Sequence, residues 1–200
     1  MDTNTGNWFS NQKKVSDAIQ NLDADGQLNS TKAMTTGPGA GITGGSGTIC
    51  ESSIVRNGNL ATTQIYIYLD GLKSTATDTD IIGLATGGAA YIGRIDEDES
   101  GVIIGVRMQC LQVPTGGDDD VYLYASDKAV GAYDTAMTDA SLGTETKLID
   151  GTGTWTLGEV SPMLAVPNTD DYLYLAAGGG DTAVEYTGGK FLIELIGYFA

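Results

Sequence analysis

The sequence contains no histidine. This absence removes the usual general base of Ser/His/Asp and Cys/His catalysis, and it removes the commonest protein ligand of zinc. No nucleotide-binding fingerprint is present, because the glycine-rich residues 37–47 lead into a predicted strand, whereas phosphate-binding loops open onto a helix N-terminus. We therefore expect neither enzymatic activity nor a cofactor or metal.

Basic residues are also scarce, with 10 lysines and arginines against 26 acidic residues and a net charge of −16. Such a surface repels phosphate backbones and anionic lipids, so we expect neither nucleic acid nor a membrane among the partners. No segment approaches the roughly twenty apolar residues that are needed to cross a bilayer. The first residues lack the basic and apolar regions of a secretory signal peptide, and none is expected.

Cysteine and proline are rare, at 2 and 4 residues, whereas glycine is abundant at 29. Cys50 and Cys110 each fall in a predicted strand, which favours buried reduced thiols, although a disulfide between them remains open. Abundant glycine with scarce proline is typical of short strands joined by tight turns. The apolar fraction of 41% is enough to form a core.

Alternating apolar residues predict an all-β domain over residues 48–200, an antiparallel sandwich or barrel of jelly-roll-like type. The dipeptide Asn57-Gly58 predicts a hairpin. The final run, Lys190–Phe199, is apolar on both faces, which predicts a central, buried strand. Residues 126–146 are expected to form a surface excursion. The predicted strands are 48–56, 60–69, 81–84, 89–95, 102–113, 121–124, 154–157, 160–166, 172–175 and 190–199.

One pattern occurs twice: a Val-Pro pair and an acidic turn precede a strand of alternating tyrosines, at residues 113–124 and again at 166–174. Proline fixes φ, and Gly, Asp and Asn suit turn positions, so each copy predicts a strand, a tight turn and a second strand. The two copies suggest two related halves of one sandwich or barrel.

Residues 1–36 differ from the rest and are expected to form an N-terminal arm, followed by a flexible linker at 37–47. Residues 11–22 have helical periodicity. The arm carries a net charge of −1, so the remaining chain carries −15. We expect the arm to contact another subunit through apolar side chains, namely Trp8, Phe9, Val15, Ile19 and Leu22.

Several acidic stretches are candidate sites. Residues 21–32 imitate the start of an EF-hand loop, but Lys32 stands where the bidentate glutamate belongs. Clusters at 96–99, 118–120 and 170–171 would suit carboxylate-based glycoside hydrolysis or calcium binding. We favour solvated turns for all of them. The tyrosine pairs would suit sugar stacking, although half-buried sheet tyrosines are the favoured interpretation.

Five stretches carry a resemblance to known proteins: 42–47, 80–83, 116–118 with the tyrosine strand after it, 156–158 and 186–195. Through them, residues 42–200 resemble a family of tailed-phage virion proteins, common in marine phages and typically encoded beside the major capsid protein. The resemblance implies a capsid decoration or cement protein on the virion surface, which binds the major capsid protein and assembles as a homotrimer at local three-fold positions. The alternatives are a head or tail fibre, or a carbohydrate-binding adhesion module, and a carboxylate-based hydrolase.

Overall fold

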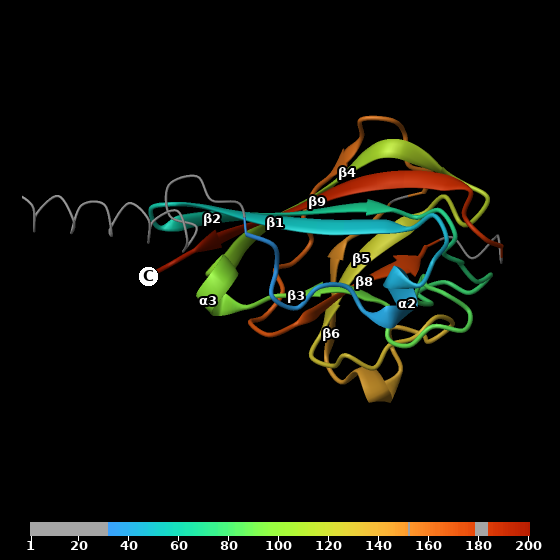
Figure 1. Ribbon diagram of the computed structural model, residues 1–200, viewed down its shortest axis with the longest axis horizontal. Helices are drawn as coiled ribbons and strands as arrows, with labels where there is room; N and C mark the ends of the chain where they lie inside the picture. Colours follow the sequence, from blue (N-terminus) through green and yellow to red (C-terminus); the bar gives the residue numbers. More distant parts are fainter. Residues whose placement is uncertain (1–31, 152, 179–183) are drawn as a thin grey trace, which may run out of the picture.

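A computed structural model describes residues 32–151, 153–178 and 184–200. It shows two antiparallel sheets that pack face to face as an open sandwich, and this confirms the all-β prediction (Figure 1). The described residues contain only short helical segments, which are α2 (Ala40–Thr43), α3 (Glu97–Ser100) and the 3-10 turn η1 (Ala140–Leu142). None of the helices in these ranges is long and apolar enough to span a membrane.

The larger sheet has five strands in the order β1-β2-β9-β4-β7. The strand β9 pairs with β2 on one side and β4 on the other, so its predicted central position is confirmed. Strands β1 and β2 form the predicted hairpin. The strand bounds are β1 (Ile49–Asn57), β2 (Leu60–Tyr68), β4 (Val102–Thr115), β7 (Val160–Ser161) and β9 (Gly188–Tyr198).

The smaller sheet has four strands in the order β3-β8-β5-β6. Alternate residues of both sheets point between the layers, and they form one continuous core. In β9 these are Phe191, Ile193 and Leu195, each fully buried. The strand bounds are β3 (Tyr91–Arg94), β5 (Val121–Ser126), β6 (Glu145–Ile149) and β8 (Tyr172–Ala177).

The repeated pattern of the sequence forms two crossovers between the sheets. The first copy joins β4 of the larger sheet to β5 of the smaller one, and the second joins β7 to β8. Strands β4 and β7 are neighbours, and so are β5 and β8. The two copies therefore lie side by side, as two corners of one sandwich.

The acidic turns in these crossovers are only partly solvated. Asp119 and Asp170 are exposed, but the prediction of solvated turns is wrong for three residues, because Asp118, Asp120 and Asp171 are 3%, 7% and 3% exposed. Asp118 Oδ1 accepts a hydrogen bond from the Asp120 backbone N–H at 2.9 Å. Asp171 Oδ2 accepts one from the Asn168 N–H at 2.7 Å. The Asp118 and Asp171 carboxylates are buried because they accept hydrogen bonds from the backbone of tight turns.

The resembling stretches 116–118 and 186–195 meet at the first crossover. The Tyr186 hydroxyl donates a hydrogen bond to the Asp118 carbonyl oxygen at 2.8 Å. A Cβ atom at Gly117 would lie 2.5 Å from the Tyr186 ring, so only glycine fits there. The glycine in this stretch thus has a packing role.

Some local predictions are wrong. Residues 81–84 form isolated bridges rather than a strand, and 154–157 form a turn that places the buried Trp155 against β5. The strand predicted at 160–166 contains only two residues of β7. Strand β6 has no apolar alternation to predict it, because its first three residues are polar or charged.

The described chain begins with a segment that packs on the sandwich. Lys32 pairs with Ile54 on the free edge of β1, and Met34 is buried beneath it. In the stretch predicted to be a linker, Ile42 of α2 is fully buried against the body. The folded body therefore includes residues 32–47. The predicted contact residues Trp8, Phe9, Val15, Ile19 and Leu22 lie outside the described residues, as does nearly all of the EF-hand-like stretch.

Both cysteines are free thiols within strands β1 and β4. Cys110 is buried, and Cys50 is half-buried with its Sγ 3.7 Å from the Ile92 carbonyl oxygen. Burial raises the pKa of Cys50 to about 12. The thiol interpretation is therefore confirmed, and Cys50 stays protonated at neutral pH.

Candidate binding face of the five-stranded sheet

The outer face of the five-stranded sheet carries a group of exposed apolar side chains. They lie at the end of the sheet formed by the β1–β2 hairpin and the C-terminal end of β9 (Figure 1). Each is between 40% and 54% exposed. We call them the apolar patch: Val55, Leu60, Val102, Ile104, Ile196 and Tyr198.

Strand register brings these residues together from four strands. Tyr198 of β9 lies opposite Leu60 of β2 on one side and Val102 of β4 on the other. The ladder between β4 and β9 has a bulge between Ile103 and Gly105, and Ile104 is the additional residue. A bulge leaves its extra residue unpaired, which accounts for the 54% exposure of Ile104.

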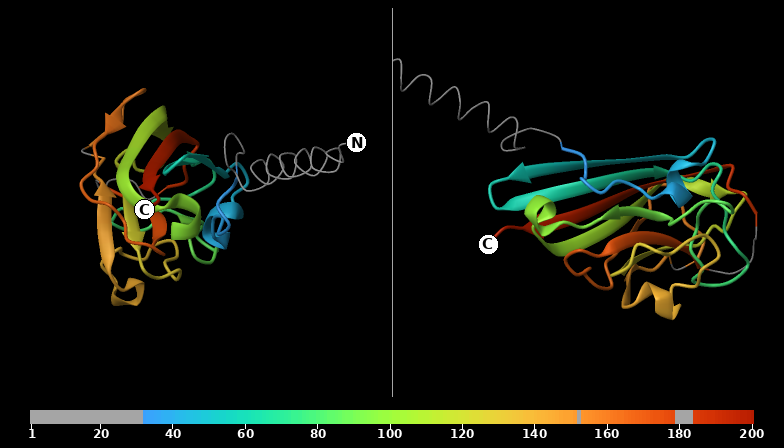
Figure 2. Two further views of the ribbon diagram at one scale, coloured as in Figure 1. Left: turned by 90° about the vertical axis from the view of Figure 1, so that its left-hand side faces the viewer. Right: turned by 60° about the horizontal axis from the view of Figure 1, so that its bottom comes forward.

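The patch lies where the larger sheet extends beyond the smaller one (Figures 1 and 2). Beneath this end, α3 supports the inner side of the sheet. The hydroxyls of Ser100 in α3 and Thr63 in β2 are 3.1 Å apart and buried. The end of the sheet that carries the patch is therefore packed against α3 on its inner side.

A polar row separates the patch from the rest of the outer face. Glu194 of β9 accepts hydrogen bonds from Arg107 Nε on β4 and from Gln64 Nε2 on β2, the latter at 2.9 Å. The bond from Arg107 lowers the pKa of Glu194 although burial opposes it. The Glu194 side chain is only 8% exposed, whereas Arg107 is 58% exposed, so the row links three strands through one nearly buried carboxylate.

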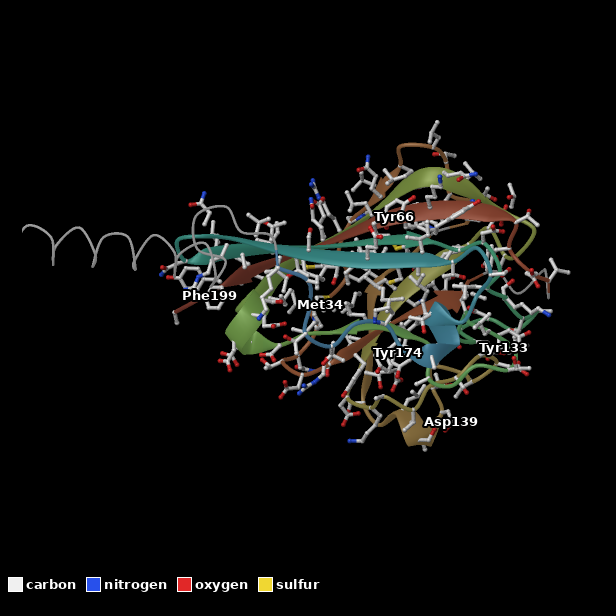
Figure 3. The ribbon with its side chains drawn as sticks, in the orientation of Figure 1. Met34, Tyr66, Tyr133, Asp139, Tyr174 and Phe199 are labelled. Carbon is white, nitrogen blue, oxygen red and sulfur yellow. The ribbon has the colours of Figure 1, made fainter. Side chains whose placement is uncertain are left out.

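A groove of about 380 Å³ adjoins the patch at the end of the sheet. Val102 and Tyr198 line it from the patch, and Glu97 and Asp98 line it from α3. The Arg56 guanidinium lies 3.7 Å above the Phe199 ring and closes another side. Figure 3 shows Phe199 at this end, near the C-terminus. The groove combines apolar walls with two carboxylates.

The entry of the N-terminal segment lies at the same end of the molecule. Lys32 pairs by backbone hydrogen bonds with Ile54, the residue before Val55 of the patch. Its Nζ contacts Glu99 Oε1 of α3 at 2.5 Å, and the Thr35 N–H donates to the same carboxylate at 3.0 Å. Although burial raises the pKa of Glu99, these bonds lower it overall. The point of entry is thus fixed beside the patch.

The outer face of the smaller sheet carries most of the tyrosines predicted for sugar stacking. Tyr174 is fully buried, and its hydroxyl donates to the Lys128 carbonyl oxygen at 2.7 Å. Tyr124 is 6% exposed. The Lys147 ammonium lies 3.8 Å from the Tyr122 ring centroid. These rings mostly contact the protein itself, which agrees with the favoured interpretation of half-buried sheet tyrosines.

One carboxylate, that of Asp120, has an unusually high pKa. Asp120 Oδ1 is buried and has no hydrogen-bond partner in the described parts of the chain. Burial, with the nearby charges of Asp118 and Asp150, raises the pKa of Asp120 to about 6. Across the described ranges, no group of three or more Cys, Asp or Glu side chains is arranged to hold a metal ion.

The apolar patch was not predicted from the sequence. Its signal lies in Lys190–Phe199, where apolar residues on both faces predict burial on both faces. The inner residues are buried, but Ile196 and Tyr198 are 40% and 43% exposed.

Comparisons with models of protein families, with curated proteins and with solved structures find no match.

Proposed function

We propose that this chain is a structural protein of a phage virion, a decoration protein that binds the outside of the capsid shell and stabilises it. The observation that carries the proposal is the apolar patch, held on the larger sheet in an otherwise strongly acidic chain. A chain with net charge −16 gains little by charge attraction to acidic surfaces. Burial of apolar side chains therefore provides the attachment.

The N-terminal segment also takes part in the proposed attachment. Trp8, Phe9 and the apolar face of Val15, Ile19 and Leu22 contact the major capsid protein or a sister subunit, and a homotrimer at local three-fold positions presents several patches to the shell. Because Lys32 enters beside Val55, both contact regions act at one end of the molecule. Several weak contacts per trimer then add through a high effective concentration.

The test is copy number, measured by quantitative mass spectrometry on particles produced from the genome that encodes this chain. A decoration protein is expected in near-stoichiometric amounts relative to the major capsid protein. Complete absence from the particles would refute the proposal. A chain that begins at Lys32 should decorate poorly, because it lacks the proposed contact residues between Trp8 and Leu22. It should still fold, because it keeps the packed residues 32–36.

A head or tail fibre, or a carbohydrate-binding adhesion module, is the second candidate. Tyr66 and Tyr68 are half-buried on the outer face of the larger sheet, and Figure 3 labels Tyr66 there. The Lys190 ammonium lies 4.8 Å from the Tyr68 ring centroid. Aromatic rings beside a polar group suit sugar stacking. This candidate requires only a few copies per particle and binding to glycans of the host surface.

A further inference from the structure

We propose that, in the free protein, residues 8–22 pack on the apolar patch of their own chain. They would cover the side chains that attach the protein to the shell, and the shell would displace them. Only this displacement rests on the proposed function. The packing itself is a property of the isolated chain, and it is tested without particles.

The first argument is position. Lys32 is hydrogen-bonded to Ile54, so the N-terminal segment enters the fold one residue from Val55 of the patch. Residues 23–31 connect this point to Leu22, and a chain of that length reaches about 30 Å when extended. The patch spans four neighbouring strands, from β1 to β4. At about 4.8 Å per strand it is roughly 15 Å wide, well within reach.

The second argument is chemical fit. Residues 11–22 have the periodicity of an amphipathic helix, with Val15, Ile19 and Leu22 on one face. About three turns of helix are marginally stable alone in water, so such a segment requires an apolar surface to pack on. The patch provides one at the end of a short tether. Contiguous apolar surface on a soluble chain is also unusual unless something covers it.

The third argument is charge. Lys13 and Lys14 are two of the ten basic residues, and they precede Val15 directly. Glu97 and Asp98 line the groove beside Val102 and Tyr198. In a helix whose apolar face lies on the patch, Lys14 lies about 100° to the side of Val15 and can approach the two carboxylates, whereas Lys13 points away from the patch. The nearly neutral segment is also less repelled by the acidic body than a second acidic body would be.

The tether selects the chain's own patch over that of another copy. A connection of only nine residues gives an effective concentration in the millimolar range. Separate copies at micromolar concentration compete poorly with it. Packing within one chain is therefore expected whether the free protein is a monomer or a trimer.

The experiment measures acrylamide quenching of tryptophan fluorescence in the full chain. Trp155 is fully buried with its Nε1 donating to the Val121 carbonyl oxygen, so acrylamide reports chiefly on Trp8. We expect weak quenching in the native chain and at least a threefold rise in Ile104→Asp/Ile196→Asp. The rise should vanish when Trp8→Phe is added to that variant.

The matched control is Val130→Asp/Leu157→Asp, which adds the same charges at side chains that are 59% and 73% exposed outside the patch. Acrylamide should quench its tryptophan fluorescence as weakly as that of the native chain. Far-ultraviolet circular dichroism should show that both double variants are folded. Lys13→Glu/Lys14→Glu should raise quenching by a smaller factor, and that rise should shrink in high salt.

Equal quenching of the native chain and the patch variant would overturn the proposal. A second result would also overturn it: protection of Trp8 in the native chain that is lost on dilution, together with protection of Trp8 in the patch variant when that variant is mixed, at micromolar concentration, with a chain beginning at Lys32. That result would show docking between copies. A decoration protein with an uncovered patch would still appear in particles at near-stoichiometric copy number, so failure of this inference is distinguishable from failure of the proposed function.

Discussion

The two outer faces of the sandwich use similar residues in opposite ways. The larger sheet presents Leu60, Tyr66, Ile196 and Tyr198 on an open face, whereas Tyr124 and Tyr174 on the smaller sheet are buried. The difference lies in the connection between β5 and β6, which places fully buried side chains over the smaller sheet, among them Met137 and Leu142. Coverage by a loop, rather than strand composition, therefore decides which face can bind.

The largest expected effect compares one tyrosine from each face. Tyr174→Ala removes a fully buried ring and its hydrogen bond to Lys128, and it should lower the free energy of unfolding by about 3–5 kcal/mol. Tyr66→Ala removes a half-buried ring and should cost only about 1 kcal/mol. Urea unfolding measures both. Equal losses would contradict the contrast between a covered and an open face.

The second effect concerns the crossover that joins the two sheets. The pKa of Asp120 is raised to about 6 in the folded chain, above its ordinary value of 3.8. The folded state therefore binds the proton more tightly, and this contribution is complete below pH 4 and is lost as the pH rises to 6. Asp120→Asn should raise stability at pH 7 by on the order of 2–3 kcal/mol.

The measurement for Asp120 is the free energy of unfolding of both chains between pH 4 and pH 7. The difference in the free energy of unfolding between the variant and the native chain should grow across this interval. Asp119→Asn is the matched control, because Asp119 is exposed in the same turn. A difference that does not vary with pH would show that Asp120 titrates normally.

The smallest effect is expected in the patch itself. In a chain that begins at Lys32, Ile104→Ser replaces a side chain that is 54% exposed, so the free energy of unfolding should change by less than about 0.5 kcal/mol. Ile103→Ser, at the neighbouring position that is 5% exposed, should cost about 2–4 kcal/mol. Thermal unfolding distinguishes the pair. A large loss at Ile104 would mean that the patch is structural.

The sequence predicts much of the fold because strand alternation is local. The β1–β2 hairpin follows from Asn57-Gly58, and the central strand follows from the apolar run after Lys190. The burial of Asp118 and Asp171 could not be predicted, because it depends on crossovers between sheets that local patterns do not reveal. The two residues of β7 depend on pairing with Met108 and Gln109 of β4, which are distant in sequence.

The binding face was predictable only in part. Alternation shows that Ile196 and Tyr198 share one face of β9, but no local signal tells whether a loop covers that face. The patch also requires the register that aligns Leu60, Tyr198 and Val102 across three strands. The sequence identifies the apolar residues that form the patch, but it does not predict that they lie together or that they are exposed.

In the proposed function, the apolar patch attaches this protein to a capsid shell. The most direct test is the number of copies per particle, by quantitative mass spectrometry, when the encoding genome carries Ile104→Asp/Ile196→Asp or the control Val130→Asp/Leu157→Asp. The account predicts near-stoichiometric occupancy for the control and at least a tenfold loss for the patch variant. Equal occupancy by the two folded variants would contradict it.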